Sequence, residues 1–351
     1  MQFVTLRDIV LHCASEGRIK KLDGRVYRPV EGAPCTYEIG GTYDDFLNAV
    51  LHGNRWFRGD LLRYLKNYNP SKMCNLVIDK DLMSFANGVL ELSTGRLVRY
   101  DCADFESYRD RVASHHIPQD YDGDDMRTPH LDIILNAQLS PDVTKALFAL
   151  IGRLLFPLGK LDSWHVMPWL FGEVDAGKTV ILRVVARLFA ERKVETLDNG
   201  VFGTAKNEYV RLSTMNDKRL IVGGNLRRIH RRPLFETIVG GWSVPITNKE
   251  AETSYVKSWD VPMMFANDIY PVGYIDSGMH IVPFMFETHI ENRDDKLFDK
   301  IVENELPKIV ARSLFEYKKA RDEAGNNGFW SWCPQELREL RDARRRDPND
   351  H

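Results

Sequence analysis

The sequence lacks several features that would place a protein in a special class. Its 351 residues include five cysteines, which lie far apart without CxxC spacing, so we expect neither a zinc site nor a disulfide framework. No apolar run reaches the roughly 18–20 residues that a membrane-spanning helix needs. The N-terminal apolar stretch is interrupted by Arg7 and Asp8, unlike that of a signal peptide. We therefore expect an intracellular protein in a reducing compartment, with no membrane partner.

The chain also lacks an excess of charge of either sign. Its 48 Lys and Arg residues against 50 Asp and Glu residues give a formal net charge of −2. A generally basic nucleic-acid binder is therefore excluded, and any such binding requires a local patch. Apolar residues make up 43% and charged residues 28% of the chain, which is ordinary globular usage and excludes disordered, collagen-like and coiled-coil classes.

Changes in composition divide the chain into parts, as its length also predicts. The predicted parts are an N-terminal α+β region at 1–72, a hairpin and helical segment at 73–160, a larger domain at 161–325 and a charged tail at 326–351. In the first two parts we expect a helix over Tyr43–Val50 capped by Thr42, a strand–turn–strand around Ser93–Gly95, and helices over Leu131–Leu139 and Pro141–Pro157.

The larger domain alternates short apolar runs with amphipathic segments. Strands are predicted at Trp164–Phe171, Arg219–Gly223, Val261–Ala266 and Ile281–Phe286, with helices at Thr179–Arg192 and within Asp294–Tyr317. Strands separated by helices predict a three-layer α/β domain with a largely parallel sheet.

One motif in this domain carries recognisable chemistry. The run Gly172-Glu173-Val174-Asp175-Ala176-Gly177-Lys178-Thr179 matches GxxxxGK[ST], and it leaves a predicted strand and enters a predicted helix. Glycines allow backbone N–H groups to turn inward onto phosphate oxygens, and the helix N-terminus adds partial positive charge. Lys178 is expected to reach the β- and γ-phosphates and Thr179 to bind Mg²⁺. The alternative is a Gly-rich turn that caps an ordinary helix.

Hydrolysis of a nucleotide needs a carboxylate as well as a phosphate cradle. The obvious place is after Arg219–Gly223, but the residues there are Gly224 and Asn225. Asn225 can hydrogen-bond a water molecule, but it carries no charge and cannot accept a proton. The next strand ends in Asn267-Asp268, where a polar residue can orient the attacking water or sense the γ-phosphate; the alternative is a turn signal.

The order of these pieces resembles the superfamily 3 helicases of the AAA+ class, specifically the helicase part of the poxvirus-type primase–helicases of large DNA viruses. The resemblance rests on the phosphate loop together with several short motifs and covers about residues 75–320. Those motifs are Ser84–Val89, Leu161–Pro168, Phe202-Gly203, Phe235–Gly240, Val244–Lys249, Trp259–Pro262, Asp276–Gly278 and Glu305–Pro307.

The resemblance implies a fold, cofactors and partners. It implies an AAA+ P-loop NTPase core that binds ATP and Mg²⁺ through the loop and senses the γ-phosphate through Asn267. The hairpin Val244–Trp259 would grip single-stranded DNA through Lys249, whose alternative is a solvated turn lysine. It further implies a homo-oligomeric ring, such as a hexamer, working with primase or other replication proteins, in the host cytoplasm or nucleus if the protein is viral.

The chain departs from the family pattern at catalytic positions. Asn225 occupies the place of an acidic residue, and the paired arginines expected after Asp276–Gly278 are missing. An arginine finger supplies roughly 10³–10⁵-fold in rate. His280 would be at most a weak substitute for the arginines. The basic run Arg227–Arg232 either compensates, contacts DNA phosphates or forms a solvated loop.

Two functions therefore remain open, with a third less favoured. The first is an ATP-dependent DNA helicase of viral DNA replication, and the second is a degenerate paralogue that binds nucleotide as a structural ligand. The third is an AAA+ scaffold that acts independently of DNA.

Overall fold

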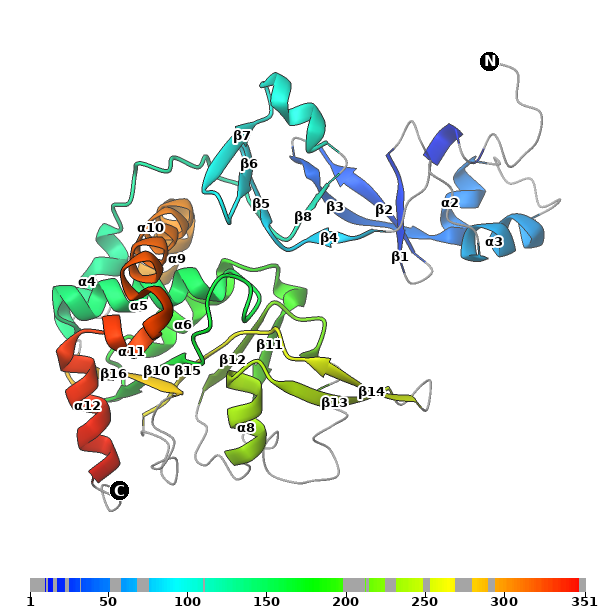
Figure 1. Ribbon diagram of the computed structural model, residues 1–351. Helices are drawn as coiled ribbons and strands as arrows, with labels where there is room; N and C mark the ends of the chain where they lie inside the picture. The colour runs from blue at the N-terminus through cyan, green and yellow to red at the C-terminus, as the bar shows by residue number, and fades with distance from the viewer. Residues whose placement is uncertain are drawn as a thin grey trace. The chain divides into compact units, whose positions relative to one another are not determined.

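The computed structural model consists of two compact units, residues 1–121 and 122–351, and each is described by itself (Figure 1). The residues that the structure describes are 10, 12–14, 18–22, 25–31, 33–50, 58–67, 76–109, 111–197, 212, 215–224, 232–248, 253–268, 280–289 and 294–346. The boundary at 121 divides the predicted segment 73–160, so its strands lie in the first unit and its helices in the second.

The described part of the first unit consists mainly of short strands, with helices that follow its third strand. It contains a three-stranded antiparallel sheet in the order β1-β2-β3 and a four-stranded sheet in the order β7-β6-β5-β9. Its elements are β1 (Lys20–Leu22), β2 (Arg25–Val30), β3 (Ala33–Thr42), α2 (Tyr43–Val50), α3 (Arg58–Asn67), β4 (Ile78–Asp79), β5 (Leu82–Phe85), β6 (Gly88–Glu91), β7 (Arg96–Arg99), the 3₁₀ helix Ala103–Ser107, β8 (Val112–Ala113) and β9 (His116–Ile117).

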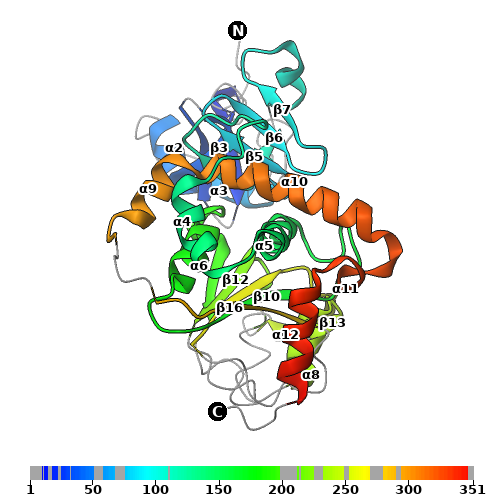
Figure 2. The ribbon, with the colours of Figure 1, turned by 90° about the vertical axis from the view of Figure 1, so that its left-hand side faces the viewer.

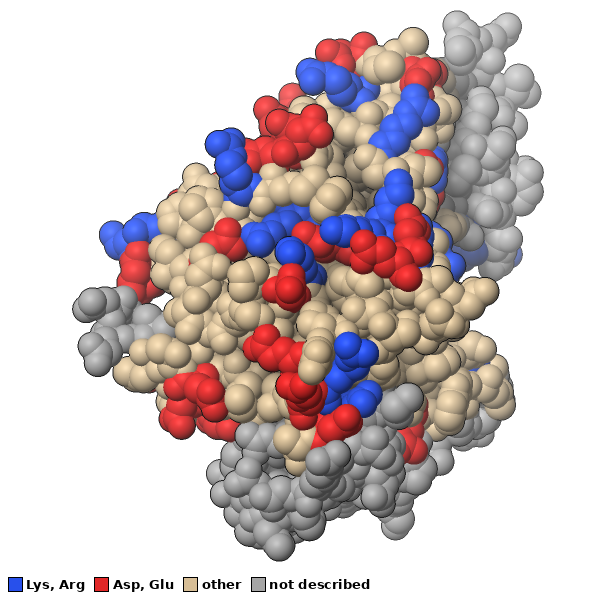
Figure 3. Space-filling model, turned by 60° about the vertical axis from the view of Figure 1, so that its left-hand side comes forward, with Lys and Arg blue, Asp and Glu red and all other residues tan. Residues whose placement is uncertain are grey.

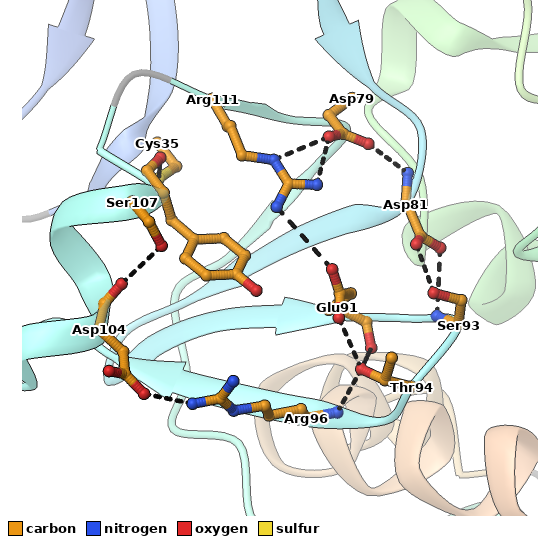
Figure 4. A network of polar contacts seen from close by, with 11 residues as sticks. Cys35, Asp79, Asp81, Glu91, Ser93, Thr94, Arg96, Asp104, Ser107 and Arg111 are labelled. Carbon is orange, nitrogen blue, oxygen red and sulfur yellow. Dashed lines mark hydrogen bonds and ion pairs between the residues drawn. The ribbon is translucent and has the colours of Figure 1, made fainter.

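Two local predictions for this unit are confirmed. Helix α2 begins with a reciprocal cap, in which the Asp45 N–H donates to Thr42 Oγ1 at 3.2 Å and the Thr42 N–H donates to Asp45 Oδ2 at 2.8 Å. The predicted strand–turn–strand is the hairpin β6–β7. Asp81 fixes its turn by accepting from the Ser93 N–H at 3.1 Å, within a network of polar contacts around Arg111 and Asp79 (Figure 4).

The second unit is built around a parallel sheet. Its five strands have the order β11-β12-β15-β10-β16, and every pairing in it is parallel, as the sequence predicted. The elements up to the sheet's last strand are α4 (Pro129–Gln138), α5 (Pro141–Leu154), β10 (Met167–Gly172), α6 (Lys178–Arg187), the 3₁₀ helix Glu191–Lys193, β11 (Val194–Leu197), β12 (Leu220–Gly224), α8 (Arg232–Val239), β13 (Ser243–Asn248), β14 (Thr253–Ser258), β15 (Met263–Ala266) and β16 (Ile281–Phe286). The C-terminal elements are α9 (Leu297–Asn304), α10 (Leu306–Ala324), the 3₁₀ helix Gly325–Asn327, α11 (Phe329–Trp332) and α12 (Gln335–Arg346).

Helices cover both faces of this sheet. Helices α5 and α6 lie on one face and α8 on the other, while α10 runs along α5 (Figures 1 and 2). The α8 face packs into an aromatic core that includes Trp169, Phe235, Phe265 and Trp259, all almost fully buried. Burial of each such ring contributes about 2–3 kcal/mol. The predicted three-layer α/β arrangement is therefore confirmed for this unit.

Some predicted boundaries were wrong for identifiable reasons. The first strand was expected from Trp164, but it begins at Met167. The Trp164 N–H is taken by Asp162 Oδ1 at 2.7 Å and its carbonyl accepts from Arg153. These groups are therefore unavailable to a sheet ladder. Helix α6 ends at Arg187 instead of Arg192. The Leu188 and Phe189 N–H groups donate to carbonyls three residues back, not four, so the last turn is of the 3₁₀ type.

Two further observations concern the described residues as a set. No helix among them combines the length and apolarity needed to cross a membrane. Four of the five cysteines are described, and none of these four, Cys13, Cys35, Cys102 and Cys333, forms a disulfide.

Candidate functional site

The loop between β10 and α6 requires glycine at both ends. Gly172 has φ of 125° and Gly177 has φ of 91°, in the region that L side chains rarely adopt. A Cβ on Gly172 would lie 2.2 Å from the Phe286 carbonyl oxygen, and a Cβ on Gly177 would lie 2.5 Å from Ile134 Cγ2. The loop therefore combines tight wrapping of its backbone with close packing against two neighbouring elements.

Helix α6 begins directly after this loop. Its first regular bond runs from the Ile181 N–H to the Gly177 carbonyl at 3.2 Å, so the N–H groups before Ile181 in the first turn have no partner four residues back. Such groups and the helix dipole favour an anion at this end. Thr179 lies in the same turn and is exposed, which leaves its hydroxyl accessible to a ligand.

The Lys178 side chain is held against the loop. Its side chain is 5% exposed, and Nζ donates to the Gly172 carbonyl oxygen at 2.9 Å and to the Glu173 carbonyl oxygen. Asp268 Oδ1 lies 3.3 Å from the same Nζ. The ammonium group thus stands inside the loop with a carboxylate beside it.

The carboxylate comes from the neighbouring strand. Strand β15 pairs with β10, with Leu170 opposite Ala266, and the pairing extends one residue further because the Asn267 N–H donates to the Leu170 carbonyl at 2.8 Å. Asn267 is 7% exposed, and its Oδ1 accepts from the Asp268 N–H at 3.0 Å. Both residues therefore lie at the carboxyl edge of the sheet, where open α/β sheets bind ligands.

Residues outside the motif hold the loop in place. Gln138, the last residue of α4, donates from Nε2 to the Ala176 carbonyl at 3.3 Å and to the Thr288 carbonyl at 2.5 Å, and it accepts from the Thr288 N–H at 3.0 Å. Nδ1 of His289 lies 3.4 Å from the Val174 carbonyl oxygen. These contacts could not be predicted from the sequence, because no local pattern links α4 or the segment after β16 to the loop.

The structure brings most of the predicted site residues together. The motif residues Gly172, Glu173, Val174, Asp175, Ala176, Gly177, Lys178 and Thr179, together with Asn267, lie at one edge of the sheet. Asn225, Lys249, the run 227–231 and Asp276–Gly278 lie outside the described residues. His280 lies at the opposite edge, before β16, with Nδ1 at 2.7 Å from the His165 carbonyl oxygen.

The residues at this edge fit a nucleotide with Mg²⁺. The donors are backbone N–H groups and one ammonium, which suit phosphate oxygens. The Thr179 hydroxyl and the Asp268 carboxylate are hard oxygen groups of the kind Mg²⁺ takes, usually one or two besides phosphates and water. Among the residues that the structure describes, no three His, Cys, Asp or Glu side chains form a metal-binding group.

The first unit has a cavity of its own. It has a volume of about 430 Å³ and is lined by residues that include Arg18, Tyr100 and Arg109. Burial raises the pKa of the Tyr100 hydroxyl to about 12. The lining residues do not form an arrangement that the sequence analysis associated with catalysis.

Comparisons with known proteins give partial structural likenesses. No family model matches the chain, and no curated protein matches it. Several solved structures do. An apo structure of the NrS-1 C-terminal region is 10% identical with a TM-score of 0.49, covering 96% of this chain and 74% of that one. Another NrS-1 structure, of the C-terminal region 305–718, is 13% identical with a TM-score of 0.39, covering 54% of this chain and 45% of that one.

A structure of JCV helicase with a bound phenoxyphenyl acetamide compound also matches. It is 12% identical with a TM-score of 0.35, and the match covers 62% of this chain and 58% of that chain. The chain thus spans less than two thirds of two of these structures. With TM-scores below 0.5, these matches do not assign the chain to a family.

Proposed function

We propose that the second unit binds ATP with Mg²⁺ at residues 172–179 and that the chain is an ATP-dependent DNA helicase of the superfamily 3, AAA+ kind. The observation that carries the nucleotide site is the loop itself. The loop begins and ends at positions that require glycine. It lies at an edge of a parallel sheet, leads into a helix N-terminus and encloses a buried lysine. A Gly-rich turn that only capped α6 would have no need for an ammonium group folded inside it.

Each residue has a role that follows from its place. The loop N–H groups and the start of α6 bind the phosphate oxygens, and Lys178 leaves its carbonyl partners to reach the β- and γ-phosphates. Thr179 supplies its hydroxyl to Mg²⁺. Asn267, buried at the end of β15, senses the γ-phosphate through its amide.

The proposal extends to DNA and to assembly. The hairpin β13–β14 pairs from Ser243 opposite Ser258 to Asn248 opposite Thr253, and it would grip single-stranded DNA near its tip, around Lys249. Basic and acidic side chains are interspersed on the face drawn in Figure 3. The net charge of −2 favours a local grip on DNA over attraction by a generally basic protein. A ring of identical subunits, working with primase and other replication proteins, completes the proposed function.

A second candidate function is a nucleotide-binding paralogue that does not hydrolyse ATP. Asn225 after β12 favours it, because an amide cannot take the proton of an attacking water molecule. Asp268 favours hydrolysis, because it places a carboxylate beside Lys178. The two functions share the nucleotide site and differ in turnover.

The test is nucleotide binding and turnover in the full chain. We expect fluorescent ATP to bind, and hydrolysis to increase with single-stranded DNA. Lys178→Ala should lower kcat/KM on the order of 10²–10³-fold, as loss of one charged donor to a reacting phosphate does. Lys145→Ala is the matched control, because Lys145 pairs with Asp142 on the surface of the same unit at 2.8 Å.

The outcomes separate the candidates. Binding without turnover, abolished in Lys178→Ala, supports the non-hydrolysing paralogue. Absence of binding in the wild-type chain, or equal ATP affinity in Lys178→Ala and Lys145→Ala, rejects the nucleotide site itself.

A further inference from the structure

We infer that Asp268 is the carboxylate that serves the Mg²⁺–nucleotide complex, from β15 instead of β12; this rests on the proposed nucleotide site. The sequence offered no acid after β12, and Asn225 occupies that place. The carboxylate closest to the loop lysine in the described residues is that of Asp268, at 3.3 Å from Nζ.

The order of the strands explains why this position is suitable. Strand β15 lies between β12 and β10, so a residue at its end stands one strand away from the loop. A residue at the end of β12 stands two strands away, about 10 Å at the usual spacing of 4.7–4.9 Å. The end of β15, which carries Asp268, is thus closer to the loop than the end of β12.

The state of the side chain is also suitable. The Asp268 side chain is 50% exposed, whereas that of Lys178 is 5% exposed. The carboxylate already contacts solvent, so it can turn toward a hydrated ion without disturbing the packing around it. The backbone at Asp268 is held by two hydrogen bonds. The Asp268 N–H donates to Asn267 Oδ1, and the Asn267 N–H donates to the Leu170 carbonyl of β10. An exposed carboxylate on a fixed backbone is the arrangement needed to exchange one partner for another.

Asp268 therefore has two partners, one before and one after the nucleotide binds. Without nucleotide it pairs with Lys178. When Lys178 turns to the phosphates, the carboxylate is left beside several negative oxygens. It then repels them unless a cation lies between, and it accepts hydrogen bonds from the water shell that Mg²⁺ usually keeps. The carboxylate thus favours Mg²⁺-ATP and opposes free ATP.

This dual effect gives a test that does not depend on activity. Affinity for fluorescent ATP is measured by titration in Mg²⁺ and in EDTA, for the wild-type chain and Asp268→Asn. In EDTA we expect the variant to bind ATP as tightly as the wild type or several-fold more tightly, because a negative charge is gone. In the presence of ATP, the Mg²⁺ concentration for half-maximal binding should rise about 10–100-fold, as for loss of other groups that orient metal ligands.

Two further variants complete the design. Asp268→Glu keeps the charge and should recover part of the Mg²⁺ response. Asp142→Asn removes the acid of the exposed Lys145–Asp142 pair and should leave both titrations unchanged. Thermal melting of each variant identifies any loss of folding. If Asp268→Asn is unfolded, the Mg²⁺ response of Asp268→Glu is compared with that of the wild type instead.

The alternatives predict other outcomes. If Asp268 only positions Lys178, Asp268→Asn weakens binding equally with and without Mg²⁺. If it only restrains Lys178, binding tightens equally in both conditions. Either result overturns the inference but leaves the nucleotide site standing, whereas absence of ATP binding by the wild-type chain rejects the proposed function itself.

Discussion

Gly177 shows how the absence of one side chain shapes the candidate site. Its φ of 91° strains any L residue, and the nearest obstacle to a Cβ is Ile134 Cγ2, the end of a side chain that can move. At Gly172 the obstacle is the Phe286 backbone, which is held in the sheet by its pairing with Gly172. The two glycines therefore differ in how their substitution can be relieved.

We expect Gly177→Ala to weaken ATP binding roughly tenfold, since a left-handed conformation costs an L residue about 1–2 kcal/mol. The double variant Gly177→Ala/Ile134→Ala removes the steric obstacle but keeps the conformational strain, so it should recover only part of the loss. Nucleotide titrations and urea denaturation of the four members of this cycle measure both effects. Full recovery in the double variant would show that strain in φ plays no part.

At the same scale, the sequence predicted the loop but not its acidic partner. The spacing of Gly172, Gly177 and Lys178 is local, and local geometry follows from residue type. The relation of Asp268 to Lys178 depends on β15 lying beside β10, and strand order is set by packing of the whole sheet. The sequence pattern therefore pointed to the residue after the second predicted strand, which is Asn225 and not an acid.

Among the elements, α4 connects the loop to the C-terminal helices. Its N-terminus is capped by the buried carboxylate of Glu305, which accepts from the His130 N–H at 2.7 Å and the Leu131 N–H at 3.1 Å. Its C-terminal residue, Gln138, bonds to the loop at Ala176. The helix is thus fixed at both ends, and the loop is positioned by a rigid element.

Gln138→Ala should therefore weaken ATP binding, and it should also lower the free energy of unfolding because it removes the bonds to Ala176 and Thr288. Each lost hydrogen bond contributes about 0.5–1.5 kcal/mol, so we expect an affinity loss of about 3–10-fold. Gln335→Ala is the matched control, because Gln335 is an exposed glutamine whose Nε2 donates to Glu339 within the same helix, α12, away from the loop. Equal affinities for the two variants would mean that the loop keeps its shape without α4.

Element by element, strong patterns were predicted and weak ones were missed. The buried strands β10, β15 and β16 have continuous apolar runs, and each was predicted from the sequence. Strand β11 was missed because Val194–Leu197 is four residues long, lies at the sheet edge and has only Leu197 buried. An edge strand is defined by its partner more than by its own composition.

For the molecule as a whole, the division into two units predicts which unit is stabilised when a nucleotide binds. All described residues of the candidate site belong to residues 122–351. A ligand that binds only the folded state stabilises it by about 2.7 kcal/mol at a concentration 100 times its Kd. That stabilisation acts on the unit that contains the site.

Hydrogen exchange of the full chain, with and without Mg²⁺-ATP, should reveal this location. We expect slower exchange in β10, the loop, α6 and the end of β15, by up to about 100-fold for amides that exchange through unfolding of the second unit. Strands β5–β7 of the first unit should exchange at unchanged rates, and Lys178→Ala should remove the effect. A local anion site stabilises first the elements whose N–H groups and side chains contact the phosphates. If exchange slows evenly over both units, the ligand therefore binds elsewhere or its binding stabilises the whole chain.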